Sequence, residues 1–67
     1  MIIFNERLKE LRTDNKLSQS QLGEILGVSQ RAISCWEKDE RRPDFETLVK
    51  IAKYFGVTTD YLLGLED

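Results

Sequence analysis

The segment from Leu17 to Glu37 carries the signals of two short helices joined by a tight turn. Ser18 and Gln21 form a capping box, in which the serine hydroxyl accepts a backbone N–H and the glutamine side chain reaches back to the cap. Gly27 stands where the first helix has to end, because glycine adopts the left-handed conformation without a Cβ clash. Ser29 follows as the cap of the second helix. These signals constrain the fold more firmly than any other part of the sequence.

The apolar residues of this segment indicate which side of each helix is buried. On the first helix they lie at positions i, i+3 and i+4: Leu22, Ile25 and Leu26. On the second helix Ile33 and Trp36 form the buried side, so Trp36 is expected in the core rather than on the surface as a platform for stacking bases. Gly23 has no side chain, which allows the second helix to cross close to the first.

Three further helices are predicted around this pair. One covers about residues 4–14 and ends at Asn15 or Lys16, of which asparagine is the better left-handed residue. Another begins after the cap Asp44 and ends at Gly56, and a short helix follows the cap Thr58 and ends near residue 64. The residues predicted to face inward are Phe4, Leu8 and Leu11, then Phe45, Leu48, Ile51, Ala52 and Phe55, and the last helix carries Tyr61, Leu62 and Leu63.

No stretch alternates between apolar and polar residues as a half-buried strand does. The predicted fold class is therefore all-α, a compact bundle of five short helices. A chain of 67 residues forms a single domain, here residues 1–67, with the helix-turn-helix at about residues 18–37.

Composition excludes several classes of function. The chain has no histidine, no cysteine pair and no glycine-rich phosphate loop, so no catalytic site, metal site or cofactor is expected. No apolar run approaches the ~20 residues that cross a membrane, and the N-terminus lacks the features of a signal peptide. The single cysteine cannot form an internal disulfide, which agrees with a reducing cytoplasm.

The exposed side of the second helix of the pair carries residues that suit the recognition of nucleic acid. Gln30 and Arg31 lie in its first turn, and Ser34 and Cys35 follow on the same exposed side. Glutamine pairs with adenine and arginine with guanine in the major groove, which a recognition helix enters with its N-terminal residues. The caps, glycines and apolar positions alone describe an αα-hairpin in a small bundle equally well. The exposed residues are what favours DNA binding.

A set of residues spread over nearly the whole chain carries a family resemblance: Arg7–Arg12, Leu17–Gln19, Gly27–Ser29, Ile33–Ser34, Trp36–Glu37, Pro43, Leu48, Ile51–Ala52, Phe55–Val57 and Asp60–Leu63. With these residues the chain resembles the Cro/phage-repressor (XRE-like) helix-turn-helix family of transcription regulators. The resemblance implies binding to specific sequences of double-stranded DNA and transcriptional regulation, with repression as the expected outcome, in the cytoplasm at the nucleoid. It also implies contacts with the DNA backbone from Gln19, Ser29, Lys38, Arg41 and Arg42.

The loop after the second helix of the pair departs from the family pattern. Asp39 stands where the family commonly has glycine, which predicts a left-handed backbone at an aspartate. Asp39 and Glu40 also weaken the positive field of Lys38, Arg41 and Arg42. These three basic residues therefore have two interpretations, as phosphate contacts or as part of a solvated charge cluster.

Other candidate residues also have two interpretations. Gln19 is either a contact with the DNA backbone or an ordinary exposed polar residue, and Ser34 contacts either a base or a phosphate. The Cys35 thiol is a poor hydrogen-bond donor that suits an apolar contact, for example with a thymine methyl group, and the alternative is a redox role. Arg12 and Glu37 are either charged residues that act near the DNA or, as the family resemblance implies, a buried ion pair that joins the first helix to the end of the recognition helix. In the second case, removing either charge is expected to destabilise the fold by a few kcal/mol.

The net charge of −2 is unusual for a protein that binds nucleic acid. Residues 1–43 carry eight basic and seven acidic side chains, whereas residues 44–67 carry two and five. The acidic excess thus lies away from the predicted recognition helix, in the C-terminal third. An alternative function follows from it, in which the fold serves as an antitoxin or adaptor that docks a basic protein partner.

A homodimer that is weak or forms only on DNA is the expected assembly. Two-fold dimers suit major-groove half-sites about 34–36 Å apart, and the sequence has no coiled coil that would enforce dimerisation. Tyr54, Tyr61 and Leu65 near the C-terminus either pack inward or form a dimer surface.

Overall fold

The computed structural model describes residues 2–66, and within them it contains helices and no strand, which confirms the all-α fold class. The five helices are α1 (Phe4–Asp14), α2 (Gln19–Leu26), α3 (Gln30–Glu37), α4 (Phe45–Phe55) and α5 (Thr59–Leu63). The starts of α2, α3, α4 and α5 are the ones that the caps predict, and the ends of α2, α4 and α5 are the ones that the glycines predict. Among the described residues, no helix has the length and apolar character needed to cross a membrane.

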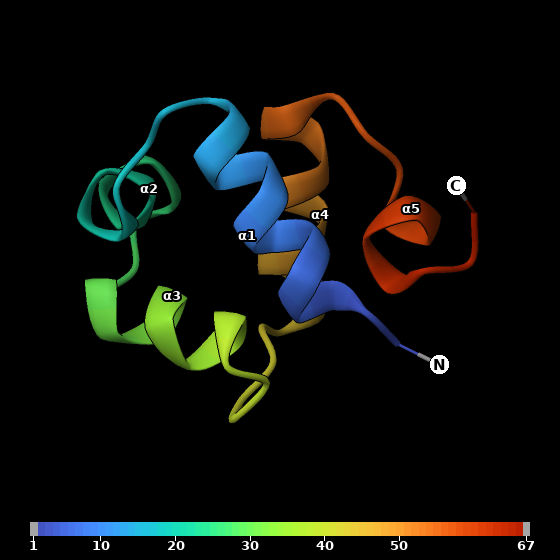
Figure 1. The fold of residues 1–67 in the computed structure, drawn as a ribbon, viewed down its shortest axis with the longest axis horizontal. Helices are drawn as coiled ribbons and strands as arrows, with labels where there is room; N and C mark the ends of the chain where they lie inside the picture. Colours follow the sequence, from blue (N-terminus) through green and yellow to red (C-terminus); the bar gives the residue numbers. More distant parts are fainter. Residues whose placement is uncertain (1, 67) are drawn as a thin grey trace.

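The helices surround one core to which each of them contributes. In Figure 1, α1 crosses in front of α4, the pair α2 and α3 lies on one side of them, and α5 lies on the other. α3 packs against both α2 and α1, and α5 packs against α1 and α4. Each helix contributes at least one fully buried side chain, and together these are Leu8, Leu22, Leu26, Ile33, Ile51 and Leu62. Trp36 is buried in the same cluster, as predicted.

Polar caps define where four of the helices begin. The side chains of Ser18, Ser29, Asp44 and Thr58 each accept a backbone N–H three residues on, at 2.8–3.1 Å. The capping box at the start of α2 is complete, since the Ser18 N–H also donates to Gln21 Oε1 at 2.8 Å. The predicted starts of α2, α3, α4 and α5 are thereby confirmed.

Of the two residues predicted to end α1, the second takes the left-handed conformation, although asparagine is the better left-handed residue. Lys16, with φ of 57°, takes the left-handed conformation, whereas Asn15 keeps φ at −91°. The Asn15 side chain donates from Nδ2 to the Leu11 carbonyl oxygen at 2.7 Å, which satisfies one of the last carbonyl groups of the helix. The backbone of Asn15 therefore stays at the helix end, and the reversal falls one residue later.

Two residues that were predicted to face inward lie on the surface. Ile25 is 40% exposed because the buried side of α2 is centred on Leu22, Gly23 and Leu26, about 100° around the helix from Ile25. Phe45 is 87% exposed. It is the first residue of α4, and helical side chains lean toward the N-terminus, so its ring projects beyond the end of the core.

The cap of α4 predicts a pH dependence of stability. Hydrogen bonds from the side chain and the backbone N–H of Thr47 lower the pKa of Asp44. Because the folded-state pKa is the lower one, this contribution is present above the unfolded-state pKa of about 3.9 and is lost as the pH falls through the folded-state pKa. We expect Asp44→Ala to melt at a lower temperature than wild type at pH 7, and the difference in melting temperature to narrow as the pH falls through the folded-state pKa of Asp44. A difference that stays constant as the pH falls would contradict the prediction.

Candidate nucleic-acid interface

The two helices of the predicted motif are held at a fixed distance by Gly23. A Cβ atom at this position would lie 2.7 Å from the Val28 carbonyl oxygen and 3.3 Å from the Ser29 carbonyl carbon. The turn between α2 and α3 therefore packs directly on the backbone of α2. Gly27 adopts φ of 73°, and the Val28 N–H donates to the Gly23 carbonyl oxygen at 2.9 Å, which ends α2 as predicted.

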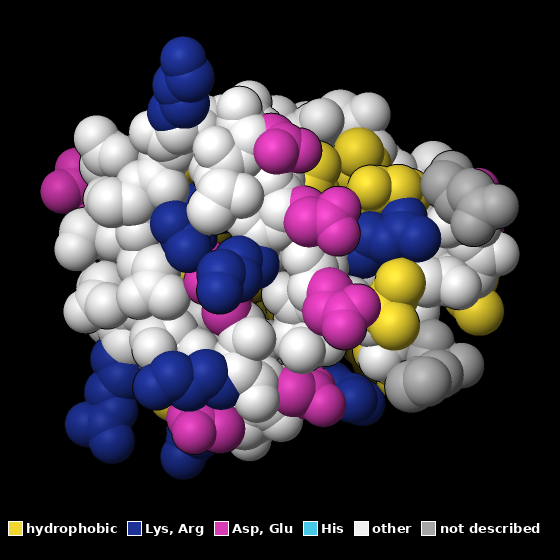
Figure 2. All heavy atoms as spheres, viewed as in Figure 1, with side chains coloured by type: hydrophobic (Ala, Val, Ile, Leu, Met, Phe, Trp, Pro, Cys, Tyr) yellow, Lys and Arg dark blue, Asp and Glu magenta, His cyan; other side chains and the backbone are white. Residues whose placement is uncertain are grey.

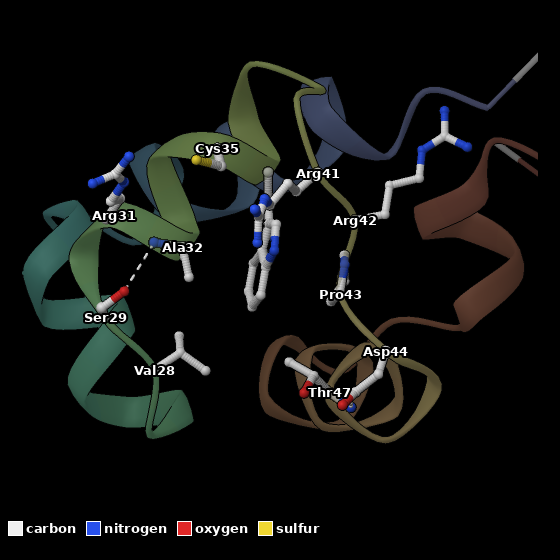
Figure 3. Close-up of a pocket in the computed structure, with 11 residues that line it drawn as sticks. Val28, Ser29, Arg31, Ala32, Cys35, Arg41, Arg42, Pro43, Asp44 and Thr47 are labelled. Atoms are coloured by element: carbon white, nitrogen blue, oxygen red, sulfur yellow. Dashed lines mark hydrogen bonds between the residues drawn. The ribbon is translucent and has the colours of Figure 1, made fainter.

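This packing presents one side of α3 to solvent. Gln30 and Arg31, in the first turn, are exposed, while Ser34 and Cys35 are half-buried. Figure 3 shows Arg31 extending outward from the start of α3, with Cys35 one turn further along the helix. The side opposite to Ile33 and Trp36 is therefore accessible along the length of the helix.

A chain of hydrogen bonds connects the start of α3 to the interior. The Gln30 amide donates from Nε2 to Gln19 Oε1 at 2.7 Å, and Gln19 donates from its own Nε2 to Glu37 Oε1 at 3.1 Å. Glu37 in turn accepts from Arg12. The side chain of Gln30 is thus oriented by residues of α2, α3 and α1. Sequence reasoning missed this connection, because Gln19, Gln30 and Glu37 share no local pattern.

Arg12 and Glu37 form a two-pronged ion pair between α1 and the end of α3. Arg12 Nε donates to Glu37 Oε2 at 2.6 Å and Nη2 donates to Oε1 at 3.0 Å, and the two side chains are 12% and 4% exposed. Arg12 Nη1 also donates to the Leu17 carbonyl oxygen at 2.8 Å. The hydrogen bond to Glu37 raises the pKa of the Arg12 guanidinium, against an opposing effect of burial. Both charges are therefore paired inside the fold and are not offered to a ligand.

The loop after α3 carries three basic side chains next to the exposed side of α3. Asp39 is left-handed, with φ of 58°, and the Glu40 N–H donates to the Cys35 carbonyl oxygen at 2.9 Å, which closes the end of α3. Arg42 Nε lies 3.3 Å from Asp39 Oδ1 in an exposed ion pair. The exposed basic residues are Lys38, Arg41 and Arg42. Figure 2 shows Lys and Arg side chains gathered around α3 and this loop, with acidic side chains among them.

A groove of about 560 Å³ separates α3 from the start of α4. Ser29, Arg31 and Cys35 line it from α3 and its cap, and Arg41 and Arg42 line it from the loop. In Figure 3 the side chains of Arg31 and Arg42 extend away from the groove in different directions. The groove therefore has cationic side chains along its rim, an arrangement that suits a polyanion lying against α3.

A row of acidic residues lies on another helix, α1. Glu6, Glu10 and Asp14 follow one another at i, i+4 and i+8 on α1 and are exposed. Figure 2 shows acidic side chains over α1, apart from the basic group at α3. The negative net charge is therefore compatible with a group of basic side chains at α3 and the loop after it, although the acidic residues are not confined to the C-terminal third.

Among residues 2–66 no three His, Cys, Asp or Glu side chains are grouped so that they could hold a metal ion.

Near the C-terminus, Tyr61 is half-buried and the guanidinium carbon of Arg7 lies 4.0 Å from the centre of its ring. Tyr54 and Leu65 are 48% and 72% exposed. Tyr61 is therefore part of the packing between α1 and α5, and the other two lie on the surface.

Comparison with known proteins identifies the motif. A family model described as helix-turn-helix matches residues 8–62 of the chain. The chain belongs to the helix-turn-helix family of transcription regulators. The fold of this regulator domain matches that of the c2 repressor of Salmonella phage P22, solved in complex with a synthetic operator. The TM-score is 0.89 and the sequence identity 36%, and the match covers 98% of this chain and 100% of that chain. This confirms the resemblance to the phage repressors.

The regulator domain also has longer relatives. It is 50% identical over 64 residues to the HTH-type transcriptional activator BcrR of Enterococcus faecalis, covering 96% of this chain and 31% of the relative. It spans 58% and 56% of two regulators of Bacillus subtilis. The same fold occurs within hydroxypropylphosphonic acid epoxidase from S. wedmorenis, with a TM-score of 0.80, 28% identity, and coverage of 90% of this chain and 32% of that chain.

Proposed function

We propose that this regulator domain binds a specific sequence of double-stranded DNA with α3 in the major groove and represses transcription by occupying the site. The observation that carries the proposal is the hydrogen bond from Gln30 to Gln19, which fixes an exposed amide at the start of α3. A protein with this role works in the cytoplasm, at the nucleoid. The side chains at this surface bind and do not catalyse.

Gln30 and Arg31 are the proposed base readers. Gln30 uses one N–H to bond Gln19, and among the described residues its second N–H and its carbonyl oxygen have no partner. This donor and acceptor are the pair that recognises the N7 and N6 groups of adenine. Arg31 is exposed in the same turn and suits the O6 and N7 acceptors of guanine.

Ser34 and Cys35 are the proposed contacts one turn further along α3. Both are half-buried, so they reach less deeply than the residues of the first turn. The Ser34 hydroxyl contacts a base or a phosphate. The Cys35 thiol makes an apolar contact, for example with the methyl group of a thymine.

The proposed contacts with the DNA backbone surround the recognition helix. Gln19 lies at the start of α2, and Ser29 caps α3 through its oxygen while its hydroxyl hydrogen remains able to donate to a phosphate. Lys38, Arg41 and Arg42 are exposed on the other side of α3 and supply positive charge. Backbone contacts of this kind fix the register of the domain without reading sequence.

The proposal is tested by selecting the 67-residue chain against a randomised duplex library at low salt, with Arg31→Ala in parallel. We expect wild type to enrich a symmetric site. Arg31→Ala should lose about 1–3 kcal/mol of discrimination at the base pair that Arg31 reads. Lys53→Ala removes an exposed positive charge from α4, away from α3, and should enrich the wild-type site. Unchanged preference in Arg31→Ala would remove Arg31 from the set of base readers.

A second candidate function is that of an adaptor or antitoxin that binds a protein partner. The exposed acidic residues Glu6, Glu10 and Asp14 on α1 favour it. Under this alternative a basic partner would dock on exposed acidic residues such as those of α1. A folded domain that enriches no duplex is the result that this alternative predicts.

A further inference from the structure

The hydrogen bonds that join Glu37, Gln19 and Gln30 run in one direction, and the charge of Glu37 sets that direction. Glu37 is paired with the guanidinium of Arg12, and a carboxylate can only accept hydrogen bonds. Gln19 therefore turns its amide nitrogen toward Glu37, with 3.1 Å between Gln19 Nε2 and Glu37 Oε1. The carbonyl oxygen of Gln19 faces the other way, where it accepts from Gln30 Nε2 at 2.7 Å.

Reversing either amide group would be unfavourable. If the Gln30 amide alone turned over, its carbonyl oxygen would face the carbonyl oxygen of Gln19 across 2.7 Å. If both amides turned over, the oxygen of Gln19 would face the carboxylate of Glu37, which is 4% exposed and poorly screened by water. Two acceptors that face each other repel and are both left without a donor. One arrangement of the two amides therefore remains.

This arrangement decides what Gln30 offers on the exposed side of α3. With its nitrogen bonded to Gln19, Gln30 offers one N–H and its carbonyl oxygen, the donor and acceptor that match N7 and N6 of adenine. In the reversed arrangement its oxygen would be bonded to Gln19, and Gln30 would offer two N–H groups, which match the N7 and O6 acceptors of guanine. The charge of Glu37 thus favours adenine over guanine at this position.

We propose that Arg12 and Glu37 are positioning residues that determine base specificity without touching DNA. They act through Gln19, which holds Gln30 in the orientation that reads adenine. Arg12 fixes the carboxylate with two hydrogen bonds, and its Nη1 also donates to the carbonyl oxygen of Leu17, two residues before Gln19. One guanidinium thereby holds both the acceptor and the segment that leads into α2. The inference rests on the proposed function and identifies the residues that set the specificity of that same surface.

Arg31 provides an internal reference, because it lies next to Gln30 in the chain but needs no such orientation. A guanidinium has only donors, so it presents N–H groups to guanine whichever way it turns. Loss of the ion pair should therefore change the preference at the base pair that Gln30 reads and leave the preference at the Arg31 base pair as it is. A pair that only stabilised the fold would affect both preferences alike, or neither.

The test measures affinity for duplexes that carry each of the four base pairs at these two positions. The positions are identified in the enriched duplex as those where Gln30→Ala and Arg31→Ala lose their preference. All affinities are measured at a temperature where circular dichroism shows each variant to be folded.

Three variants separate orientation from stability. The double variant Arg12→Met and Glu37→Met removes the carboxylate without leaving a buried charge unpaired. Gln19→Met removes the intermediate residue and keeps the ion pair. Gly56→Ala is the stability control, because its Cβ atom strains the left-handed backbone at the end of α4 and, beyond the chain neighbours, meets no atom within 4 Å.

We expect wild type to prefer A·T over G·C at the Gln30 position by about tenfold or more. The double variant and Gln19→Met should lower this preference to about twofold or less, with the preference at the Arg31 position unchanged. Gly56→Ala should keep both preferences. A wild-type preference in the double variant or in Gln19→Met, or a parallel loss at both positions in the double variant, would overturn the proposal.

NMR relaxation of the side-chain amides tests the same ordering in the free domain, without DNA. The Gln30 amide should be ordered in wild type and mobile in the double variant. Gln21 is the control amide, because its oxygen accepts the Ser18 N–H in the capping box, which does not involve the ion pair. A Gln30 amide that is equally mobile in both proteins would overturn the proposal. If no duplex is enriched although Gln30 is ordered in wild type alone, the proposed function fails and the positioning by the ion pair stands.

Discussion

Replacing Arg12 with alanine is expected to destabilise the domain by about 3 kcal/mol, because it leaves the Glu37 carboxylate buried without a positive partner. Glu37 is 4% exposed and would keep only the hydrogen bond from Gln19. The Leu17 carbonyl oxygen would also lose its donor. For a domain of this size the loss corresponds to a fall in melting temperature of roughly 12–24 °C, measured by circular dichroism.

Two further variants separate the ion pair from general effects of charge. Glu10→Ala removes an exposed charge from the same helix and should shift stability by less than about 0.5 kcal/mol. In the double variant Arg12→Met and Glu37→Met neither charge is left unpaired, so much of the lost stability should return. Melting curves of Arg12→Ala that coincide with those of wild type would show that the pair contributes nothing.

The helix boundaries were predictable because their causes are local. A serine that accepts the N–H three residues on, or a glycine with φ of 73° at Gly27, acts within one turn of the chain. The correspondence of the predicted and observed starts of α2, α3 and α4 follows from this locality. The left-handed backbone of Asp39 was predicted in another way, from the family resemblance, because the family commonly has glycine at this position.

The errors arose where tertiary packing decided the outcome. The stripe predicted for α2 included Ile25, but Gly23 faces the turn before α3 and rotates the buried side away from Ile25. The hydrogen bond from Gln30 to Gln19 joins residues eleven positions apart, which no periodic pattern records. Phe45 had the right spacing for the core, yet it lies beyond the end of the core. The spacing of apolar residues in the sequence gives the direction of each side chain around the helix axis. It does not show whether another helix packs against that side chain.

Gly23→Val is expected to cost about 3 kcal/mol, at the upper end of the usual range for overpacking. The nearest obstacle to a Cβ atom is the Val28 carbonyl oxygen at 2.7 Å, which is backbone and cannot rotate away. Relief therefore requires α2 and the turn before α3 to separate. Valine is a better helix former than glycine, so helix propensity slightly favours the substitution and the loss measured by thermal melting reflects the steric term.

Gly56→Ala provides the matched control for this prediction. Gly56 has φ of 68°, and beyond its chain neighbours no atom lies within 4 Å of the place that a Cβ atom would take, so alanine there meets backbone strain of about 1–2 kcal/mol and no clash. The two variants should also differ in DNA binding. Because Gly23→Val moves α3 relative to α2, Gln30 should lose its bond to Gln19, and affinity for the enriched duplex should fall even at temperatures where the domain is folded. Equal affinities of folded Gly23→Val and Gly56→Ala would show that the spacing of α2 and α3 does not control recognition.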